Sequence, residues 1–412
     1  MDPMRTFISF EEALTCVLEQ AVPMPLEMVP LDEVLGRTLA SPVVAAGDVP
    51  PFASSAMDGF AVRSQDVGKG STTLKVVGHI AAGDPGGQRV EPGTCMEIMT
   101  GAPFPEGADA VAPIEWVKER SGDIVTFDRF PERYKHVRPA AEDVRIGQEV
   151  FSAGEIITPA VVGMLATLGV DPVPVRRAPR VRVISTGSEI VSPSMVPGPG
   201  QIRNSNGPSL RAQVLVAGGH CTSYEHADDD PAAIAELLAS GPEADLIIFS
   251  GGVSVGDHDH VKRVLDDAGA DMLFWKVRQR PGKPLAFGKL GSALFLGLPG
   301  NPVSSAMCFE IYGRSLIERM LGRRTQRTPL VKARLGRVIR KVDGLHFFTR
   351  GVVSATAGGE LSVVDTGPQR SNLYGSVVKA NCIVHLPEEG AEAGEGSLVD
   401  IQMLPWALPD GA

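Results

Sequence analysis

The sequence predicts a multidomain α/β plus β protein, and two observations lead to this prediction. From residue 180 to residue 322, apolar strands alternate with helical patterns, which is typical of a mostly parallel sheet covered by helices on both faces. On either side, short apolar runs alternate with glycine and proline turns, as in small β domains. The chain has 412 residues, too many for one ordinary core, so roughly two to four domains are expected.

The composition excludes several classes of function. The net charge is −10 and aromatic residues make up 5% of the chain, so neither a broad basic surface nor stacking platforms for nucleic acid are expected. The five cysteines are scattered singly, without zinc-type or redox-motif spacing, which favours a reducing compartment. The longest apolar run, residues 159–170, is too short to cross a bilayer, and the N-terminus lacks a signal-peptide pattern. We therefore expect a cytoplasmic protein without nucleic-acid or membrane partners.

The first part of the chain predicts one helix followed by β structure. Ser9 and Glu12 form the pattern of a capping box, which predicts a helix over 10–20. Short apolar runs between 41 and 150 predict a small β-rich domain. Thr158-Pro159 at the start and Gly169 at the end predict a short helix.

The α/β segment is expected to contain four strand–helix units, with strands near 181–185, 222–225, 246–249 and 293–296. Its helices are expected to begin near Pro208, after a cap at Asp230, near His258, and after a cap at Asn301. Parallel sheets bind ligands beyond the carboxyl ends of their strands, so the turns at those ends are the candidate sites. From residue 324, short strands predict a C-terminal β-barrel.

Two small-residue turns follow strands of this sheet. Glycine permits a left-handed backbone and brings N–H groups close to an anion. The nearby hydroxyls and carboxylates suit a phosphate and Mg²⁺. The alternative is that both are ordinary turns, with a solvated glutamate in the first and helix-capping aspartates in the second. The first turn offers Ser185, Thr186, Gly187 and Glu189, and the second offers Ser250, Gly251, Gly252, Ser254 and Asp259.

Residues 276–284 form a basic segment in a net acidic chain. If the segment is extended, Lys276, Arg278 and Arg280 lie on one face, and Lys283 follows. Such a face would bind an oxyanion or phosphate. The alternative is a solvated strand edge protected by its charges.

Two further motifs are ambiguous on their residues alone. Pro299, Gly300, Asn301 and Pro302 form a strand–turn–helix junction, which is either a capped helix start or a close approach to a flat ligand. Asp58-Gly59 on its own indicates a tight turn. The residues alone therefore predict a phosphorylated or nucleotide-like ligand.

Six segments, in this order, resemble the molybdopterin molybdenumtransferase family, which includes the C-terminal domain of gephyrin. The resemblance extends over about residues 10–405. The matching segments are 55–61, 98–103, 185–189, 250–259, 281–284 and 298–304.

The resemblance implies four domains. These are an elongated dimerisation region (1–45 and 146–178), a β-rich lid domain (46–145), an α/β molybdopterin-binding domain (179–323) and a C-terminal β-barrel domain (324–412). It implies a homodimer whose active site lies between the α/β domain of one subunit and the lid of the other. It implies an Mg²⁺-dependent reaction of adenylyl-molybdopterin with molybdate to give molybdenum cofactor and AMP, with an upstream adenylyltransferase and molybdoenzyme chaperones as partners.

The resemblance also implies residue roles. Asp58 and Thr100 would belong to the lid side of the cleft, and Lys276 and Lys283 would attract molybdate or phosphate as catalytic residues. Arg350 and Ser376 would reach molybdate from the barrel. Glu189, Asp228 and Asp259 would serve the metal, with Asp229 and Asp230 as open alternatives to Asp228.

One position of the basic segment departs from the family pattern: Arg280 stands where the family usually has lysine. Two rival functions also stay open. One is a nucleotide-pyrophosphate hydrolase built on the same α/β domain. The other is a gephyrin-like scaffold.

Overall fold

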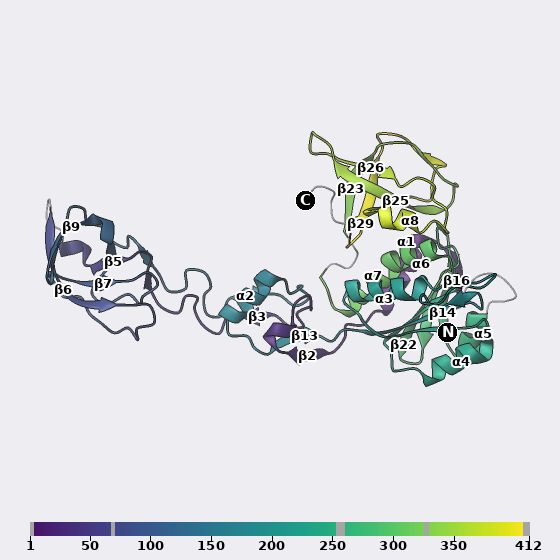
Figure 1. Cartoon of the computed structure of the whole chain (residues 1–412), viewed down its shortest axis with the longest axis horizontal. Helices are drawn as coiled ribbons and strands as arrows, with labels where there is room; N and C mark the ends of the chain where they lie inside the picture. The colour runs from purple at the N-terminus through teal and green to yellow at the C-terminus, as the bar shows by residue number, and fades with distance from the viewer. Residues whose placement is uncertain (1–3, 67–70, 253–259, 325–328, 407–412) are drawn as a thin grey trace.

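The computed structural model, which describes residues 4–66, 71–252, 260–324 and 329–406, has an extended shape (Figure 1). A β-rich domain lies at one end, and an α/β domain with a β-barrel beside it lies at the other. A narrow region carrying α2 connects the two ends. The predicted fold class is confirmed. None of the helices within the described ranges is both long and apolar enough to cross a membrane.

The α/β domain contains a seven-stranded sheet with the order β1-β19-β21-β22-β18-β14-β17. The strands β14, β17, β18 and β22 run parallel, and β21 is antiparallel to both of its neighbours. In the register, Ser185 lies opposite Ser250, and Ser250 lies opposite Leu298, so three carboxyl ends meet at one edge. The strands are β1 (Arg5–Ile8), β14 (Arg180–Thr186), β17 (His220–Ala227), β18 (Leu246–Ser250), β19 (Asp271–Val277), β21 (Ala286–Leu290) and β22 (Ala293–Leu298).

Helices cover both faces of this sheet. Alternate residues of β14 show the two cores: Val181 and Val183 pack with the helices of one face, and Ile184 packs with those of the other. The first face carries α1 (Phe10–Gln20), α3 (Asn206–Ala217), α6 (Pro302–Cys308) and α7 (Arg314–Met320), and the second carries α4 (Pro231–Ser240) and α5 (His260–Asp267).

The predicted single helix after Asn301 is interrupted. Between α6 and α7 lies a π-helical turn, η4 (Phe309–Gly313). A Cβ on Gly313 would lie 2.7 Å from Cδ2 of Phe309, so the ring packs where glycine leaves space. Periodicity alone does not distinguish such a widened turn from an ordinary one.

The N-terminal helix is confirmed, and so is its capping box. The backbone N–H of Ser9 donates to Glu12 Oε2 (2.8 Å), and the backbone N–H of Glu12 donates to Ser9 Oγ (3.2 Å). Its position differs from the expected domain division, however. Because β1 pairs with β19 and α1 buries Ala13 and Val17 in the α/β core, residues 5–20 pack with the α/β domain and not with the elongated region.

The elongated region is built from two separate stretches of chain, which pair as β2 with β13 and as β3 with β12. The short helix α2 begins after Thr158, whose Oγ1 accepts from the N–H of Val161 (3.4 Å), as predicted. The elements are β2 (Leu26–Val29), η1 (Leu31–Glu33), β3 (Val43–Val44), β12 (Glu149–Phe151), α2 (Pro159–Thr167) and β13 (Val173–Arg176).

The lid domain contains a six-stranded sheet with the order β8-β5-β7-β6-β10-β9. Gly59 begins β5, and a Cβ on it would lie 2.2 Å from the carbonyl oxygen of Ala112 on β8. Glycine at this position is therefore required by close strand packing, not by the tight turn that the sequence indicated. The elements are β4 (Ser54–Ser55), β5 (Gly59–Val62), η2 (Ser64–Asp66), β6 (Thr72–Ile80), β7 (Thr94–Ile98), β8 (Ala110–Pro113), η3 (Ile114–Trp116), β9 (Val117–Ser121), β10 (Ile124–Phe127) and β11 (Val137–Arg138).

The C-terminal domain is a closed barrel, because β25 pairs with both β26 and β27. It packs on the α/β domain through Phe348, Val377 and Ile383, which share a core with α1 and α7. Its elements are β23 (Leu330–Leu335), β24 (Ile339–Arg340), β25 (His346–Ala355), β26 (Leu361–Asp365), α8 (Gly375–Lys379), β27 (Cys382–Leu386), β28 (Glu392–Ala393) and β29 (Leu398–Met403), with β20 (Gln279–Arg280) added at one edge.

Two histidines lie where the barrel meets α1. The ring of His346 lies 4.6 Å from the rings of both Phe10 and Phe348, and 5.7 Å from that of His385. Burial lowers the pKa of His346 to about 3 and that of His385 to about 4. Both imidazoles are therefore neutral in the folded protein at neutral pH.

We expect Gly59→Ala to destabilise the lid domain by about 1–3 kcal/mol, because its Cβ would meet backbone atoms that cannot rotate away. Chemical denaturation would measure the change in the free energy of unfolding. Gly47→Ala is the control, since a Cβ on Gly47 meets nothing within 4 Å. Equal effects of the two substitutions would contradict the packing argument.

We expect His346→Phe to reduce the loss of stability in acid. The pKa of His346 is near 6.5 in the unfolded chain and about 3 in the folded protein. Its neutral ring therefore contributes fully to the free energy of unfolding above pH 6.5. This contribution is lost as the pH falls towards 3, at up to about 1.4 kcal/mol per pH unit. Phenylalanine keeps the ring packing and cannot titrate. Denaturant unfolding at pH 6.5 and pH 4.5 should show a smaller difference for the variant than for the wild type; an equal difference would exclude His346 as the source.

Candidate active site

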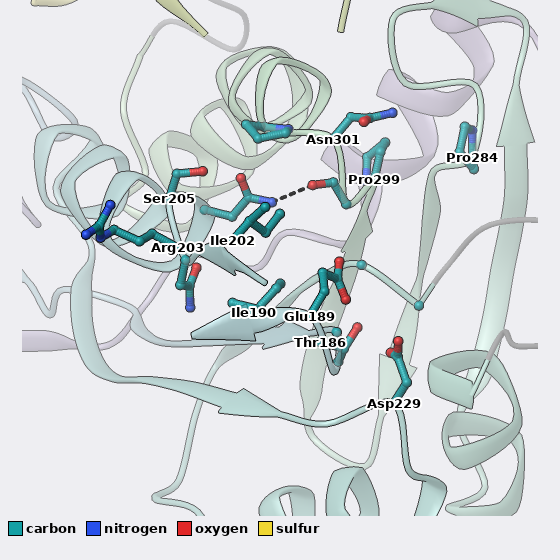
Figure 2. Close-up of a pocket in the computed structure, with 17 residues that line it drawn as sticks. Thr186, Glu189, Ile190, Ile202, Arg203, Ser205, Asp229, Pro284, Pro299 and Asn301 are labelled. Atoms are coloured by element: carbon teal, nitrogen blue, oxygen red, sulfur yellow. Dashed lines mark hydrogen bonds between the residues drawn. The ribbon is translucent and has the colours of Figure 1, made fainter. Parts of the chain in front are cut away.

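A pocket with a volume of about 520 Å³ opens at the carboxyl ends of β14, β18 and β22 (Figure 2). We call it the strand-end pocket. Its position is the one that the parallel sheet predicted. It is lined by Thr186, Gly187, Glu189, Ile190, Ile202, Arg203, Asn204, Ser205, Asn206, Asp229, Gly251, Gly252, Pro284, Pro299, Gly300, Asn301 and Pro302.

Three glycines shape the floor of this pocket. Gly187, Gly251 and Gly252 all have positive φ angles, of 147°, 100° and 65°. A Cβ on Gly251 would lie 2.7 Å from the carbonyl oxygen of Thr186, so only glycine lets these two turns approach so closely. The predicted left-handed glycine turns are therefore present, and they bring backbone from two neighbouring strand ends together.

A polar link fixes the turn after β22. Asn206, at the start of α3, donates from Nδ2 to Ser250 Oγ and to the carbonyl oxygen of Gly300, each at 2.8 Å. Asn301 is the N-cap residue of α6 and Pro302 opens the helix, as expected, but the Asn301 side chain makes no capping hydrogen bond.

Two carboxylates lie in the pocket, those of Glu189 and Asp229. Of the three aspartates that the sequence left open, Asp229 lines the pocket and Asp228 does not, while Asp230 caps α4 by accepting from the N–H of Ala232 (3.2 Å). A hydrogen bond from the backbone N–H of Asp229 to Ser188 Oγ (3.1 Å) holds Asp229 in place.

The donor set in the pocket suits one kind of metal site. Within the described ranges, no three His, Cys, Asp or Glu side chains gather into a metal site. Two carboxylates alone suit Mg²⁺, which usually binds one or two carboxylates and completes its shell with substrate phosphates and water. They do not suit a closed cage of protein ligands.

Two of the predicted hydroxyls do not line the pocket. Ser185 is fully buried, and Ser250 is engaged by Asn206 and by Ser305 (3.2 Å). Both hydroxyls lie inside the wall, not on its surface. Thr186 does line the pocket and is itself 4% exposed.

The basic segment alternates as expected: Lys276, Arg278 and Arg280 are half-buried or exposed, and Val277 and Gln279 between them are buried. Arg278 is paired, because its Nε donates to Glu388 Oε2 (3.0 Å). The remaining cations lie over aromatic rings. Lys276 Nζ is 3.9 Å from the ring centroid of Trp275, Lys283 Nζ is 5.0 Å from that of Phe7, and the Arg280 guanidinium is 5.7 Å from that of Phe347.

The end of the basic segment reaches the pocket through Pro284. A buried network holds the loop before it. Gln279 Nε2 donates to the carbonyl oxygens of Pro281 and Gly282, each at 3.2 Å, and Tyr312 on η4 donates to Gln279 Oε1 at 2.5 Å. The loop that carries Lys283 is therefore anchored to the same helical segment as the pocket turn at Pro302.

Arg350 of the barrel is a buried cation without an acidic partner. It is 1% exposed, its Nε and Nη1 have no hydrogen-bond partner within the described residues, and its Nη2 donates to the Arg370 carbonyl (3.4 Å). Burial lowers the pKa of its guanidinium to about 10. Desolvating a cation without a counter-ion is costly, so this position favours an anion.

The loop after β26 links Arg350 to the strand-end pocket. The N–H of Val303 on α6 donates to the Ser371 carbonyl (3.3 Å), and Tyr374 bonds Ser209 of α3 (2.6 Å). Ser376 donates to the Leu373 carbonyl (2.6 Å) at the end of this loop. Neither Arg350 nor Ser376 lines the pocket itself.

The two lid residues contact each other but lie far from the pocket of the same chain. Asp58 Oδ1 accepts from the backbone N–H and the hydroxyl of Thr100, both at 2.7 Å, and these donors lower the pKa of Asp58. The lid and the α/β domain lie at opposite ends of the molecule (Figure 1).

The structure brings together nine of the residues that the sequence singled out: Thr186, Gly187, Glu189, Gly251, Gly252, Pro299, Gly300, Asn301 and Pro302. Ser254 and Asp259 lie outside the described residues. Sequence reasoning missed one whole wall of the pocket: Ile190, Ile202, Arg203, Asn204, Ser205 and Asn206. A signal was present, because residues 204–206 are polar and precede a predicted helix at the same sheet edge.

Known proteins match this architecture along nearly its full length. Three family descriptions match consecutive parts: MoeA N-terminal region (domain I and II) over 8–169, Probable molybdopterin binding domain over 182–319, and MoeA C-terminal region (domain IV) over 332–404. The strand-end pocket lies in the second of these.

Full-length relatives point the same way. The molybdopterin molybdenumtransferase of Haemophilus influenzae is 35% identical over 400 residues, covering 96% of this chain and 98% of its own. Molybdopterin molybdenumtransferase 2 of Mycobacterium tuberculosis is 36% identical, covering 92% and 94%. A crystal structure of the molybdopterin biosynthesis MoeA protein from Pyrococcus horikoshii superposes with a TM-score of 0.83 at 28% identity, covering 96% and 99%. With this identity over nearly the whole chain, the protein belongs to the molybdopterin molybdenumtransferase family.

Proposed function

We propose that this protein is the enzyme that inserts molybdenum during molybdenum-cofactor biosynthesis, converting adenylyl-molybdopterin and molybdate into molybdenum cofactor and AMP. The observation that carries the proposal is the strand-end pocket. It joins a glycine-lined anion cradle to two carboxylates, within the part of the chain that matches the molybdopterin-binding description.

The diphosphate of the substrate would lie over the glycine turns. Gly187, Gly251 and Gly252 bring backbone close to the ligand, and the absence of side chains leaves room for phosphate oxygens. Glu189 and Asp229 would hold Mg²⁺ together with those oxygens. When bound, this metal supplies positive charge that offsets the charge of the diphosphate and of the departing AMP.

Molybdate would lie towards the barrel. Arg350 has unpaired nitrogens, Ser376 is nearby on the same domain, and the loop of Arg280 and Lys283 is anchored next to α6. Lys276 adds charge at the other end of the basic segment. Fixed cations attract a dianion without reorganising during the reaction. The two dithiolene sulfurs would then replace two oxygens on molybdenum, and these oxygens would leave as water with the two thiol protons and two further protons. One water molecule would cleave the diphosphate, which gives AMP and leaves the other phosphate on the cofactor.

The lid would act in a partner subunit. Asp58 and Thr100 lie far from the pocket of their own chain, so a homodimer would bring them to the pocket of the other copy. We also propose a cytoplasmic location, with the substrate received from an adenylyltransferase and the product passed to molybdoenzyme chaperones.

The reaction can be tested directly. Incubation with adenylyl-molybdopterin, Mg²⁺ and molybdate is expected to release AMP and to reconstitute a molybdoenzyme that lacks its cofactor. Omitting molybdate, or adding EDTA, should lower the rate of AMP release by at least about tenfold, because both the acceptor anion and the charge on the diphosphate are removed. Molybdate-independent AMP release would favour a nucleotide-pyrophosphate hydrolase, and no release at all would favour a scaffold.

The role of the lid predicts the behaviour of Asp58→Ala. Asp58 is exposed, so the fold should survive while the rate of AMP release falls about a hundredfold. Asp123→Ala is the matched control, because Asp123 is an exposed carboxylate of the same domain that pairs with Lys75 (3.4 Å). Full activity of Asp58→Ala would remove this residue from the active site.

Mixing two inactive variants tests the shared site. Asp58→Ala lacks the lid group and Glu189→Ala lacks the pocket carboxylate. Random pairing in a homodimer should restore about a quarter of wild-type activity, because half the dimers are mixed and each has one intact site. Activity that stays at the level of the separate variants after subunit exchange would exclude a site shared in this way.

A further inference from the structure

The strand-end pocket contains one apolar stretch among polar groups. Pro284, which follows Lys283, and Pro299 lie on one side, and Ile190 and Ile202 lie on the other, with Arg203 and Ser205 beyond them (Figure 2). Glu189 lies between the prolines and the isoleucines in the same view.

The two isoleucines lie on short strands, β15 (Ile190–Val191) and β16 (Ile202–Arg203). Ile190 and Ile202 are direct partners in the register of these parallel strands, so their side chains make one surface. We call it the isoleucine wall. Ile202 lines the pocket and is 54% exposed, so its side chain is accessible to a ligand. A single exposed isoleucine is ordinary, but a registered pair inside a polar pocket is a surface suited to a flat ring.

Hydrogen bonds hold the isoleucine wall rigidly against the rest of the site. The N–H of Ile202 donates to the Glu189 carbonyl and the N–H of Asn204 to the Val191 carbonyl, both at 2.8 Å. Arg203 Nε donates to the carbonyls of Pro193 (3.1 Å) and Met195 (3.0 Å). The wall is thus fixed to the backbone of Glu189, and a preformed surface loses little entropy when a ligand binds.

The order of groups in the substrate selects the part that meets this wall. In adenylyl-molybdopterin the diphosphate separates the pterin dithiolene from adenosine. The dithiolene must meet molybdate, and Lys283, a candidate molybdate residue, directly precedes Pro284 of the pocket lining. With the diphosphate at Glu189 and Asp229, adenosine extends towards the isoleucine wall.

We propose that Ile190 and Ile202 form the platform on which the adenine ring of the substrate packs. This inference rests on the proposed function and assigns the orientation of the substrate in its site.

Titration calorimetry with AMP and Mg²⁺ tests the platform. Ile202→Ala should raise the Kd for AMP about fivefold to tenfold, through lost apolar burial, and should raise the KM for adenylyl-molybdopterin similarly with little change in kcat. Ile202→Tyr should retain AMP affinity, because a flat side chain also supports a ring. Val196→Ala is the matched control: Val196 is 86% exposed in the same connection and does not line the pocket.

The outcomes separate the two proposals. Molybdate-dependent AMP release by the wild type, together with unchanged Kd and KM in Ile202→Ala, would overturn the platform and leave the proposed function standing. A wild type that does not bind AMP would also overturn it. Weaker binding of free molybdopterin, with unaltered AMP binding, would place the pterin on this wall and reverse the assigned orientation. Wild-type protein that binds AMP but never releases it from the substrate would contradict the proposed function alone.

Discussion

The close approach of two strand-end turns is the constraint on which the site depends. Gly251 lies so close to Thr186 that a Cβ on it would be 2.7 Å from the Thr186 carbonyl oxygen. Its φ of 100° also favours glycine. The parallel register of β14, β18 and β22 puts these turns level with each other. Because the turns have no side chains, the pocket floor is backbone, and the functional groups enter from its walls.

The position of single cations matters more in this protein than its net charge. The chain carries a net charge of −10, yet Arg350 lies buried with no carboxylate beside it and with two nitrogens unpaired within the described residues. Arg278, by contrast, is neutralised by Glu388. A cation kept free of acidic partners in a low-dielectric interior acts strongly on an incoming anion, whereas a paired surface cation acts weakly. The barrel would therefore contribute selectivity for an anion as well as packing.

The sequence predicted those features of the fold that depend only on neighbouring residues. The capping box at Ser9, the cap at Asp230 and the glycine turns all follow from neighbouring residues, and all are present. The features that the sequence did not predict depend on contacts between segments far apart in the chain. The pairing of Arg278 with Glu388, which neutralises one cation of the basic segment, depends on two residues far apart in the sequence. The choice among three consecutive aspartates depended on which one the β17–α4 turn directs inwards, and the isoleucine wall became a wall only through the pairing of β15 with β16.

The extended shape has a consequence for catalysis. Two chain segments join the lid to the elongated region, and Val49 pairs with Val144 between them. The lid of one chain therefore leaves the pocket of that chain open to water, where Coulomb attraction between fixed cations and molybdate is weakest. Covering the pocket with the lid of a second copy would exclude that water and add Asp58 at the same moment. Assembly and electrostatic catalysis would then be one event, and the distance between lid and pocket within a single chain would be what makes the second copy necessary.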